Sequence, residues 1–263
     1  MAAPVSMLPI IDGACLPARV ASMVWRGSEV GFVAADVVAT GFTPLDAELP
    51  GGGWPRRSLT EILQPQPSLC EWRLLGHCLR SMVEGGGELM LVSPPHAPHL
   101  PGLEQYGLKA GKLVWLDARL PSERLWATEQ LIKSNPQGAI LAWLPQARSE
   151  QLRRLQVCAQ SCEALVFLFR PAAAQFEASP APLRILASLG NDWQLNIQVL
   201  KRRGPIQARP LSLFALSRSL ASVLTPRQLR PAPLTTLSPE ISHDISALGR
   251  SAGEPAPSRF AAH

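Results

Sequence analysis

Short apolar runs alternate with amphipathic segments through the middle of the chain, and this alternation is typical of a parallel α/β fold. The apolar runs predict buried strands over 58–63, 88–92, 112–116, 138–144 and 164–169. Helical spacing of apolar residues predicts helices over 44–49, 71–84, 103–108, 122–133 and 150–161. We therefore expect a mainly parallel sheet with helices on both faces.

The chain after the last of these runs predicts two further features. Segments 184–188 and 195–200 flank Gly190-Asn191-Asp192 and predict a β-hairpin. Residues 211–224 are amphipathic and predict a C-terminal helix, whereas the Pro-, Ser-, Thr- and Ala-rich residues beyond Thr225 predict a largely disordered tail. The predicted organisation is an N-terminal arm (1–38), an α/β domain (39–210) and a C-terminal helix with a tail (211–263).

The composition is typical of a cytoplasmic globular protein. The 263 residues are 46% hydrophobic and 17% charged, so the chain can bury a sizeable core. The first residues lack the basic start of a signal peptide, and five cysteines, an odd number, suit reduced thiols. No run approaches the roughly 20 apolar residues of a membrane helix, so we expect no membrane partner.

The net charge of +5 and the pI of about 9.3 are compatible with nucleic acid or an acidic protein as a partner. Two basic groups contribute to the excess: Arg153-Arg154 on a predicted helix, and Lys201-Arg202-Arg203 at a predicted strand end. These five residues are our candidates for a DNA or subunit contact, and a solvated basic surface remains the alternative.

The stretch from Ala39 to Leu63 organises the rest of the chain. Thr43-Pro44 predicts a helix start, with Thr43 as the cap and proline in the first turn. Three consecutive glycines, 51–53, predict a sharp turn with positive φ angles. The strand that follows ends in Glu-Ile-Leu, a position from which a nucleotide-binding protein would continue into a phosphate-binding loop. Here the loop reads Gln64, Pro65, Gln66, Pro67, Ser68, Leu69, Cys70 and Glu71.

Eight segments, in this order along the chain, resemble the ImuA family, the RecA-like and SulA-like accessory proteins of bacterial translesion-synthesis cassettes. They are TGFTPLDAELPGGGWPR (40–56), LTEIL (59–63), LVSPPHAPHL (91–100), LWATEQ (125–130), GAILAWL (138–144), LRRLQ (152–156), FLFRP (167–171) and LKRRG (200–204). The resemblance implies a RecA-like, P-loop-type α/β fold.

The same resemblance implies a role in the SOS response, in DNA damage tolerance and induced mutagenesis. The implied partners are ImuB and, through ImuB, an error-prone C-family DNA polymerase, with RecA and DNA as further candidates. The implied location is the cytoplasm, in association with the nucleoid. The basic strand end at 201–203 corresponds to a place where RecA-like filaments contact a neighbouring subunit.

The chemistry that the RecA pattern requires is missing from this chain. A phosphate-binding loop needs converging backbone N–H groups, a lysine and a magnesium-binding hydroxyl. Cys70 stands in the lysine position and Glu71 in the hydroxyl position, and Pro65 and Pro67 remove backbone donors. A carboxylate at Glu71 would also repel a phosphate, by on the order of 1–4 kcal/mol per charge pair at 4 Å.

The acidic and basic groups of an ATPase are missing as well. The strand at 138–144 ends in Trp143-Leu144-Pro145 instead of a magnesium-binding acid, and His96 is better interpreted as a loop residue than as a general base. Cys158 and Cys162 lack the clustered partners of a metal site. We therefore predict a degenerate nucleotide site with no catalytic residue, metal or cofactor, although weak ATP binding stays open.

Three functional interpretations follow. The first is a non-catalytic adaptor that bridges ImuB, the polymerase and damaged DNA. The second is a DNA-dependent ATPase that modulates RecA, and the third is a SulA-like inhibitor of cell division.

Overall fold

The computed structural model describes residues 36–191, 193–204, 207, 209–216, 218–225 and 228. All of them lie in the first of two compact units, Met1–Pro231. The arm before residue 36 and the tail after residue 228, including its expected disorder, lie outside the described residues.

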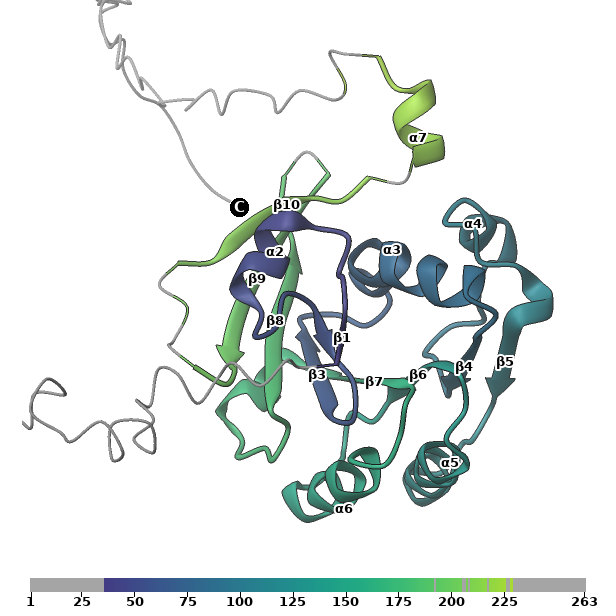
Figure 1. The fold of residues 1–263 in the computed structure, drawn as a ribbon, viewed down its shortest axis with the longest axis vertical. Coiled ribbons are helices and arrows are strands. Elements are labelled where there is room, and N and C mark those ends of the chain that lie inside the picture. Colours follow the sequence, from purple (N-terminus) through teal and green to yellow (C-terminus); the bar gives the residue numbers. More distant parts are fainter. Residues whose placement is uncertain are drawn as a thin grey trace, which may run out of the picture. The chain divides into compact units, whose positions relative to one another are not determined.

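The described residues form a large mixed sheet with the strand order β10-β9-β8-β3-β7-β6-β4-β5 (Figure 1). Its strands are β3 (Leu59–Gln64), β4 (Glu88–Val92), β5 (Leu113–Leu116), β6 (Gly138–Trp143), β7 (Leu165–Pro171), β8 (Leu183–Leu189), β9 (Gln194–Lys201) and β10 (Leu211–Phe214). The pairs from β8 to β5 are parallel, and β9 and β10 add antiparallel pairs. The expected mainly parallel sheet is confirmed.

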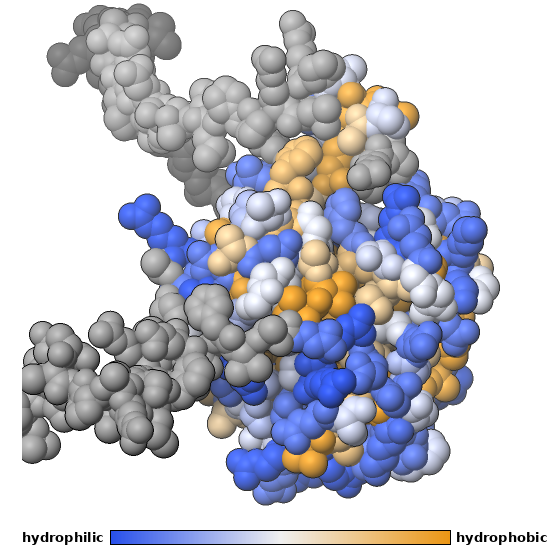
Figure 2. All heavy atoms as spheres, in the orientation of Figure 1, coloured by the Kyte–Doolittle hydropathy of each residue, from blue (hydrophilic) through white to orange (hydrophobic). Residues whose placement is uncertain are grey.

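Helices cover both faces of this sheet (Figure 1). They are α2 (Thr43–Glu48), α3 (Glu71–Glu84), α4 (Leu100–Glu104), α5 (Pro121–Ser134), α6 (Ser149–Ala159) and α7 (Arg218–Val223), with short 3-10 turns η2 (Ala110–Lys112) and η3 (Ala172–Phe176). One apolar core lies between the sheet and α2 and α3, and a second lies between the sheet and α5 and α6. The outer surface over α5 and α6 is largely hydrophilic, as expected for helices with one buried face (Figure 2).

Strand β3 lies near the middle of the sheet and is buried along its whole length. Leu59 packs in the core on the α5–α6 side, and Ile62 packs in the core on the α3 side. A strand that is covered on both faces needs apolar residues at successive positions, which explains the continuous apolar run that predicted it.

The start of the organising stretch differs from the expectation. The residue before α2 is Phe42 and no side chain caps the helix, so Thr43 is the first helical residue and not the cap. Thr40 instead closes the turn, since its hydroxyl accepts from the Phe42 N–H (3.0 Å) and its own N–H donates to the Asp46 carboxylate (2.8 Å).

The triple-glycine turn is confirmed in part. Gly51 and Gly52 have φ angles of +82° and +85°, but Gly53 is not in the left-handed region. A Cβ on Gly53 would lie 2.4 Å from the carbonyl oxygen of Val38. Glycine is required there because strand β1 (Val37–Val38), which pairs with β2 (Trp54–Pro55), passes so close.

Two helix predictions need correction. The helix expected over 103–108 begins earlier and is the short α4, Leu100–Glu104. Residues 211–224 are not one helix, because Leu211–Phe214 pairs with β9 as the edge strand β10 before α7 begins. Among the residues that the structure describes, no helix is long and apolar enough to span a bilayer.

Candidate functional site

The carboxyl ends of the parallel strands β3, β4, β6 and β7 share one edge of the sheet. Open α/β sheets bind their ligands outside this edge, in the loops that follow the strands. Two regions of this edge differ in their chemistry: the loop between β3 and α3, and a cleft between α5 and α6.

The loop after β3 is organised around the carboxylate of Glu71, which is the first residue of α3 and only 1% exposed. Its Oε1 accepts from the Nε2 of Gln64 (2.6 Å), the backbone N–H of Ser68 (2.7 Å) and the indole Nε1 of Trp143 (3.0 Å). Its Oε2 accepts from the backbone N–H of Cys70 (3.1 Å). Four uncharged donors therefore satisfy the hydrogen-bonding capacity of a single buried carboxylate.

At this helix N-terminus, the group that accepts the backbone N–H groups is a carboxylate of the chain itself. Backbone N–H groups that converge at a helix N-terminus bind phosphate in many proteins. Ser68 adopts a positive φ of +65°, uncommon for a residue with a side chain, where the loop turns its N–H toward the carboxylate. We expected Glu71 to repel a phosphate from an open loop, and in the structure its carboxylate instead accepts the backbone N–H groups of Ser68 and Cys70.

The remaining loop residues contribute little chemistry. The Cys70 thiol is buried, and burial followed by the nearby negative charge of Glu71 raises its pKa to about 11, against the opposing effect of Arg73. A thiol with this pKa stays protonated and is a poor nucleophile near neutral pH. Pro65 and Pro67 line a small cavity beside the loop, and Leu69 is exposed.

The other positions considered for nucleotide chemistry have structural roles. Trp143, at the end of β6, stacks on Phe169 with ring centroids 4.7 Å apart while it donates to Glu71. His96 is exposed in the loop after β4. Within the described residues, no group of three or more His, Cys, Asp or Glu could hold a metal ion.

A buried ion network that we did not predict lies beside this loop. Glu61, in the middle of β3, is fully buried and accepts from Arg170 Nη1 on β7 (2.7 Å) and from Arg184 Nε on β8 (2.5 Å). Arg170 also donates to the Ala147 carbonyl and to Glu177. Burial lowers the pKa of Arg170, but its hydrogen bonds to Glu61 and Glu177 outweigh this effect, so the net shift of the pKa is upward. The signal in the sequence was one charged residue inside each of three apolar strands.

The first predicted basic group, Arg153 and Arg154, lies on α6. Arg154 forms an ion pair with Glu129 of α5, and Lys133 pairs with the same carboxylate (2.7 Å). Arg153 is exposed and has no ion pair among the described residues.

The second predicted basic group lies at the end of β9. Lys201 donates to the Ser179 carbonyl (2.8 Å), and Arg202 forms an ion pair with Glu48 of α2 (2.7 Å). Arg203 has no ion pair with any described residue and lines a small cavity. No hydrogen bond or ion pair between described residues joins the two predicted groups, and ion pairs compensate two of their five positive charges, those of Arg154 and Arg202.

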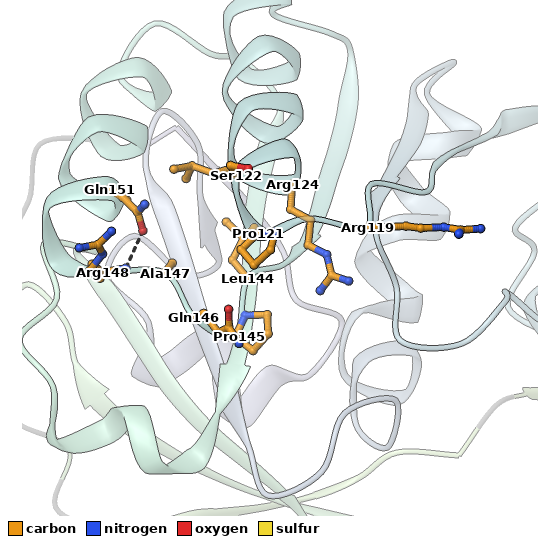
Figure 3. A pocket seen from close by; sticks show the side chains of 11 residues that line it. Arg119, Pro121, Ser122, Arg124, Leu144, Pro145, Gln146, Ala147, Arg148 and Gln151 are labelled. Carbon is orange, nitrogen blue, oxygen red and sulfur yellow. Dashed lines mark hydrogen bonds between the residues drawn. The ribbon is translucent and has the colours of Figure 1, made fainter.

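A more open region lies between the N-terminal ends of α5 and α6 (Figure 3). It is a cavity of about 730 Å³. Its lining residues are Arg119, Pro121, Ser122, Arg124, Leu125, Leu144, Pro145, Gln146, Ala147, Arg148 and Gln151. The three arginines belong to three separate segments, which is why the sequence did not reveal them as a group.

A second cavity, of about 330 Å³, adjoins the first and shares Arg124 and Pro145 with it. Its other lining residues are Gln64, Pro65, Pro67, Ser93, Pro94, Pro95, Asp117, Trp143, Phe169, Arg170 and Pro171. Prolines and two aromatic rings therefore make an apolar wall, which carries a few polar groups.

The fold defines a mixed α/β protein with a large, mostly parallel sheet flanked by helices. No protein-family model matches the chain. The cell division inhibitor SulA of Edwardsiella piscicida is 25% identical to it over 118 residues, which cover 45% of this chain and 70% of that protein. This weak likeness agrees in part with the expected SulA-like relationship, and membership of the ImuA family stays a prediction.

Proposed function

We propose that this chain is a non-catalytic accessory protein of the SOS response, which acts in DNA damage tolerance and induced mutagenesis. It would bridge ImuB and, through ImuB, an error-prone C-family DNA polymerase, with RecA and DNA as further partners. The ImuA-like segments give the proposal its partners, and the distant likeness to SulA supports an SOS-related role. We also propose that the sheet is a RecA-like, P-loop-type fold that has lost its nucleotide site.

The single observation that carries the non-catalytic part is the position of the Glu71 carboxylate. It occupies the anion place of the loop after β3 and accepts four hydrogen bonds there. A nucleotide phosphate would have to displace this carboxylate or lie against it, at a cost of on the order of 1–4 kcal/mol per charge pair. In the same loop, Cys70 and Glu71 stand at the positions of the lysine and the magnesium-binding hydroxyl.

The bridging part is tested by a pull-down of purified ImuB from the same cassette. The full chain and a truncation at Thr225 are each used as bait, at low and at high salt. We expect the full chain to retain ImuB, and loss on truncation would place the docking site in the tail. No retention at any salt concentration would overturn the bridging proposal.

The non-catalytic part is tested by ATP turnover with and without single-stranded DNA. We expect no turnover above that of a buffer control. Turnover that depends on DNA and changes in Glu71→Ala would instead support the RecA-modulating ATPase.

The likeness to SulA favours a second candidate function, inhibition of cell division. Under this proposal the chain alone blocks polymerisation of the division protein FtsZ. Light scattering of FtsZ with increasing amounts of the full chain measures the effect directly, and unchanged polymerisation at a molar excess rules the candidate out.

A further inference from the structure

We propose that the cavity between α5 and α6 binds the phosphodiester backbone of single-stranded nucleic acid. We call it the arginine cleft and define it by Arg119, Arg124 and Arg148. This cleft would be the place at which the proposed accessory protein contacts DNA. The inference rests on the proposed function only in the choice of DNA as the physiological polymer. The cleft is distinct from the loop after β3, where Glu71 occupies the anion place.

The lining of the cleft carries three positively charged side chains. No aspartate or glutamate lines it, and none of its three arginines forms an ion pair with a described residue. Arg124 is held in place because its Nε donates to the Ala118 carbonyl (2.9 Å), which leaves its terminal nitrogens for a ligand. Guanidinium groups bind phosphate oxygens through paired N–H donors, so unpaired arginines in a cavity suit this ligand.

Two helices add to the positive potential. Helix α5, of 14 residues, and helix α6, of 11 residues, both begin at the cleft, and in each a side chain of the first turn, Glu123 or Gln151, accepts from the backbone N–H of the residue before the helix. The positive ends of both helix dipoles are therefore directed at the cavity. The Glu123 carboxylate in the first turn of α5 is bound to the Leu120 N–H and offsets part of this effect.

The arrangement of the arginines favours a polymer over a single anion. Figure 3 shows Arg124 reaching from α5 toward Leu144 and Pro145, with Arg148 on the opposite wall at the start of α6. Arg119 extends outward from the loop before α5 and away from the other two (Figure 3). Cations that follow a path, and do not converge on one point, match a chain of successive phosphates.

The adjoining cavity favours nucleic acid over an acidic peptide. Six of its lining residues are prolines, and Asp117 is the acidic residue among them. This largely apolar lining suits the flat, apolar face of a nucleobase, whereas an acidic peptide would find few polar partners there. Paired bases inside a duplex cannot enter such a cavity, so the ligand is a single strand.

Fluorescence anisotropy of a labelled 20-nucleotide oligo-dT, titrated with the full chain at low salt, tests the proposal. The cleft variant is Arg119→Ala/Arg124→Ala/Arg148→Ala. The matched control, Lys109→Ala/Lys112→Ala/Arg209→Ala, removes the same number of positive charges from positions outside the cleft and outside the two basic groups predicted from the sequence. Since all six side chains lack an ion pair among the described residues, both variants are expected to fold, and circular dichroism verifies this.

We expect the cleft variant to bind at least about tenfold more weakly and to lose about two units of salt slope. The control variant should weaken binding by less than about threefold, as expected for loss of general attraction alone. An Arg→Lys triple variant of the cleft keeps the charge but not the paired donors, and should bind about two- to fivefold more weakly.

Each other outcome would overturn the proposal. Equal weakening by the cleft and control variants would mean general charge attraction, and no binding of the oligonucleotide at low salt would exclude the site. Equally tight binding of a 20-base-pair duplex would remove the single-strand assignment. Competition by poly-glutamate at the same charge concentration would assign the cleft to an acidic peptide. None of these results depends on ImuB, so they are independent of the pull-down.

Discussion

The loop after β3 and the arginine cleft lie at the same edge of one sheet, but they differ in how their charged groups are partnered. In the loop, the Glu71 carboxylate takes up the donors that could have held a phosphate. In the cleft, three arginines remain without an acidic partner among the described residues. The loop after β3 is therefore closed by a carboxylate of the chain itself, whereas the neighbouring cavity is open.

This difference shows that a region can bind a charged ligand where the fold leaves its charged side chains without partners. Arg154 and Arg202 belong to conspicuous basic runs but are paired with Glu129 and Glu48. Arg119 and Arg148 are isolated in the sequence and lack such partners among the residues that the structure describes. The following predictions separate compensated from uncompensated charge, from the largest expected effect to the smallest.

Glu61→Ala should destabilise the protein most, because it leaves Arg170 and Arg184 buried without their shared carboxylate. We expect a loss of about 3–5 kcal/mol in the free energy of unfolding, measured by urea denaturation. The control Glu84→Ala removes an exposed carboxylate that pairs with Arg80 and should cost under about 0.5 kcal/mol. A loss below about 1 kcal/mol for Glu61→Ala would contradict a compensated buried network.

Glu71→Ala should open the closed loop. The substitution leaves the N–H groups of Ser68 and Cys70 and the side chains of Gln64 and Trp143 without their acceptor, at a cost of about 2–3 kcal/mol in urea denaturation. Sulfate at ten times its dissociation constant should restore about 1.4 kcal/mol in this variant. The comparison is with chloride at equal ionic strength and with the unsubstituted chain, and equal effects of both salts would argue against an anion site.

Protonation of Glu129 should lower the free energy of unfolding at acidic pH. The hydrogen bond from Lys133 lowers the pKa of Glu129 and burial opposes it, while Arg154 lowers it further, so the net shift is downward from 4.5. Its stabilisation is therefore present above about pH 4.5 and is lost as the pH falls through the folded-state pKa. Urea denaturation between pH 6 and pH 3 should show a shallower loss in Glu129→Gln, by up to about 1 kcal/mol. If the free energy of unfolding falls equally with pH in the original protein and in Glu129→Gln, Glu129 does not contribute to the pH dependence.

The triple alanine variant of the arginine cleft should leave the free energy of unfolding within about 0.5 kcal/mol of the original value. Its arginines have no ion pair to lose within the described part of the fold, and the hydrogen bond from Arg124 to the Ala118 carbonyl is a small loss, so binding and stability should respond separately. Urea denaturation at low salt is the measurement. A loss above about 1.5 kcal/mol would show that these arginines hold the structure together, and the contrast between the two regions would then fail.

Much of the fold follows from the sequence because the elements have strong local signals. The helix expected over 71–84 has the bounds Glu71–Glu84, and the apolar run at 88–92 is strand β4. Leu211–Phe214 was interpreted as helix because its leucines continue into a longer amphipathic segment. Its strand conformation depends on pairing with β9, which local spacing does not reveal.

The candidate site was predictable only in part. The residues of the loop after β3 were identified, but not the role of Glu71, because Trp143 reaches its carboxylate from 72 positions along the chain. The arginine cleft was missed because its members lie after β5, on α5 and after β6, and meet only through the order of the strands. One available signal was the position of Arg119 and Arg148 just beyond two predicted strands.

The central position of β3 also affects how the protein can be made. Its neighbours β7 and β8 begin at Leu165 and Leu183, about a hundred residues after β3 is complete. At about 5–20 residues per second, a ribosome needs on the order of 5–20 s to produce them. During this interval the nascent strand has no pairing partner, and Glu61 is the charged residue that interrupts its apolar sequence. We expect Glu61 to protect the emerging chain from aggregation until Arg170 and Arg184 have been synthesised.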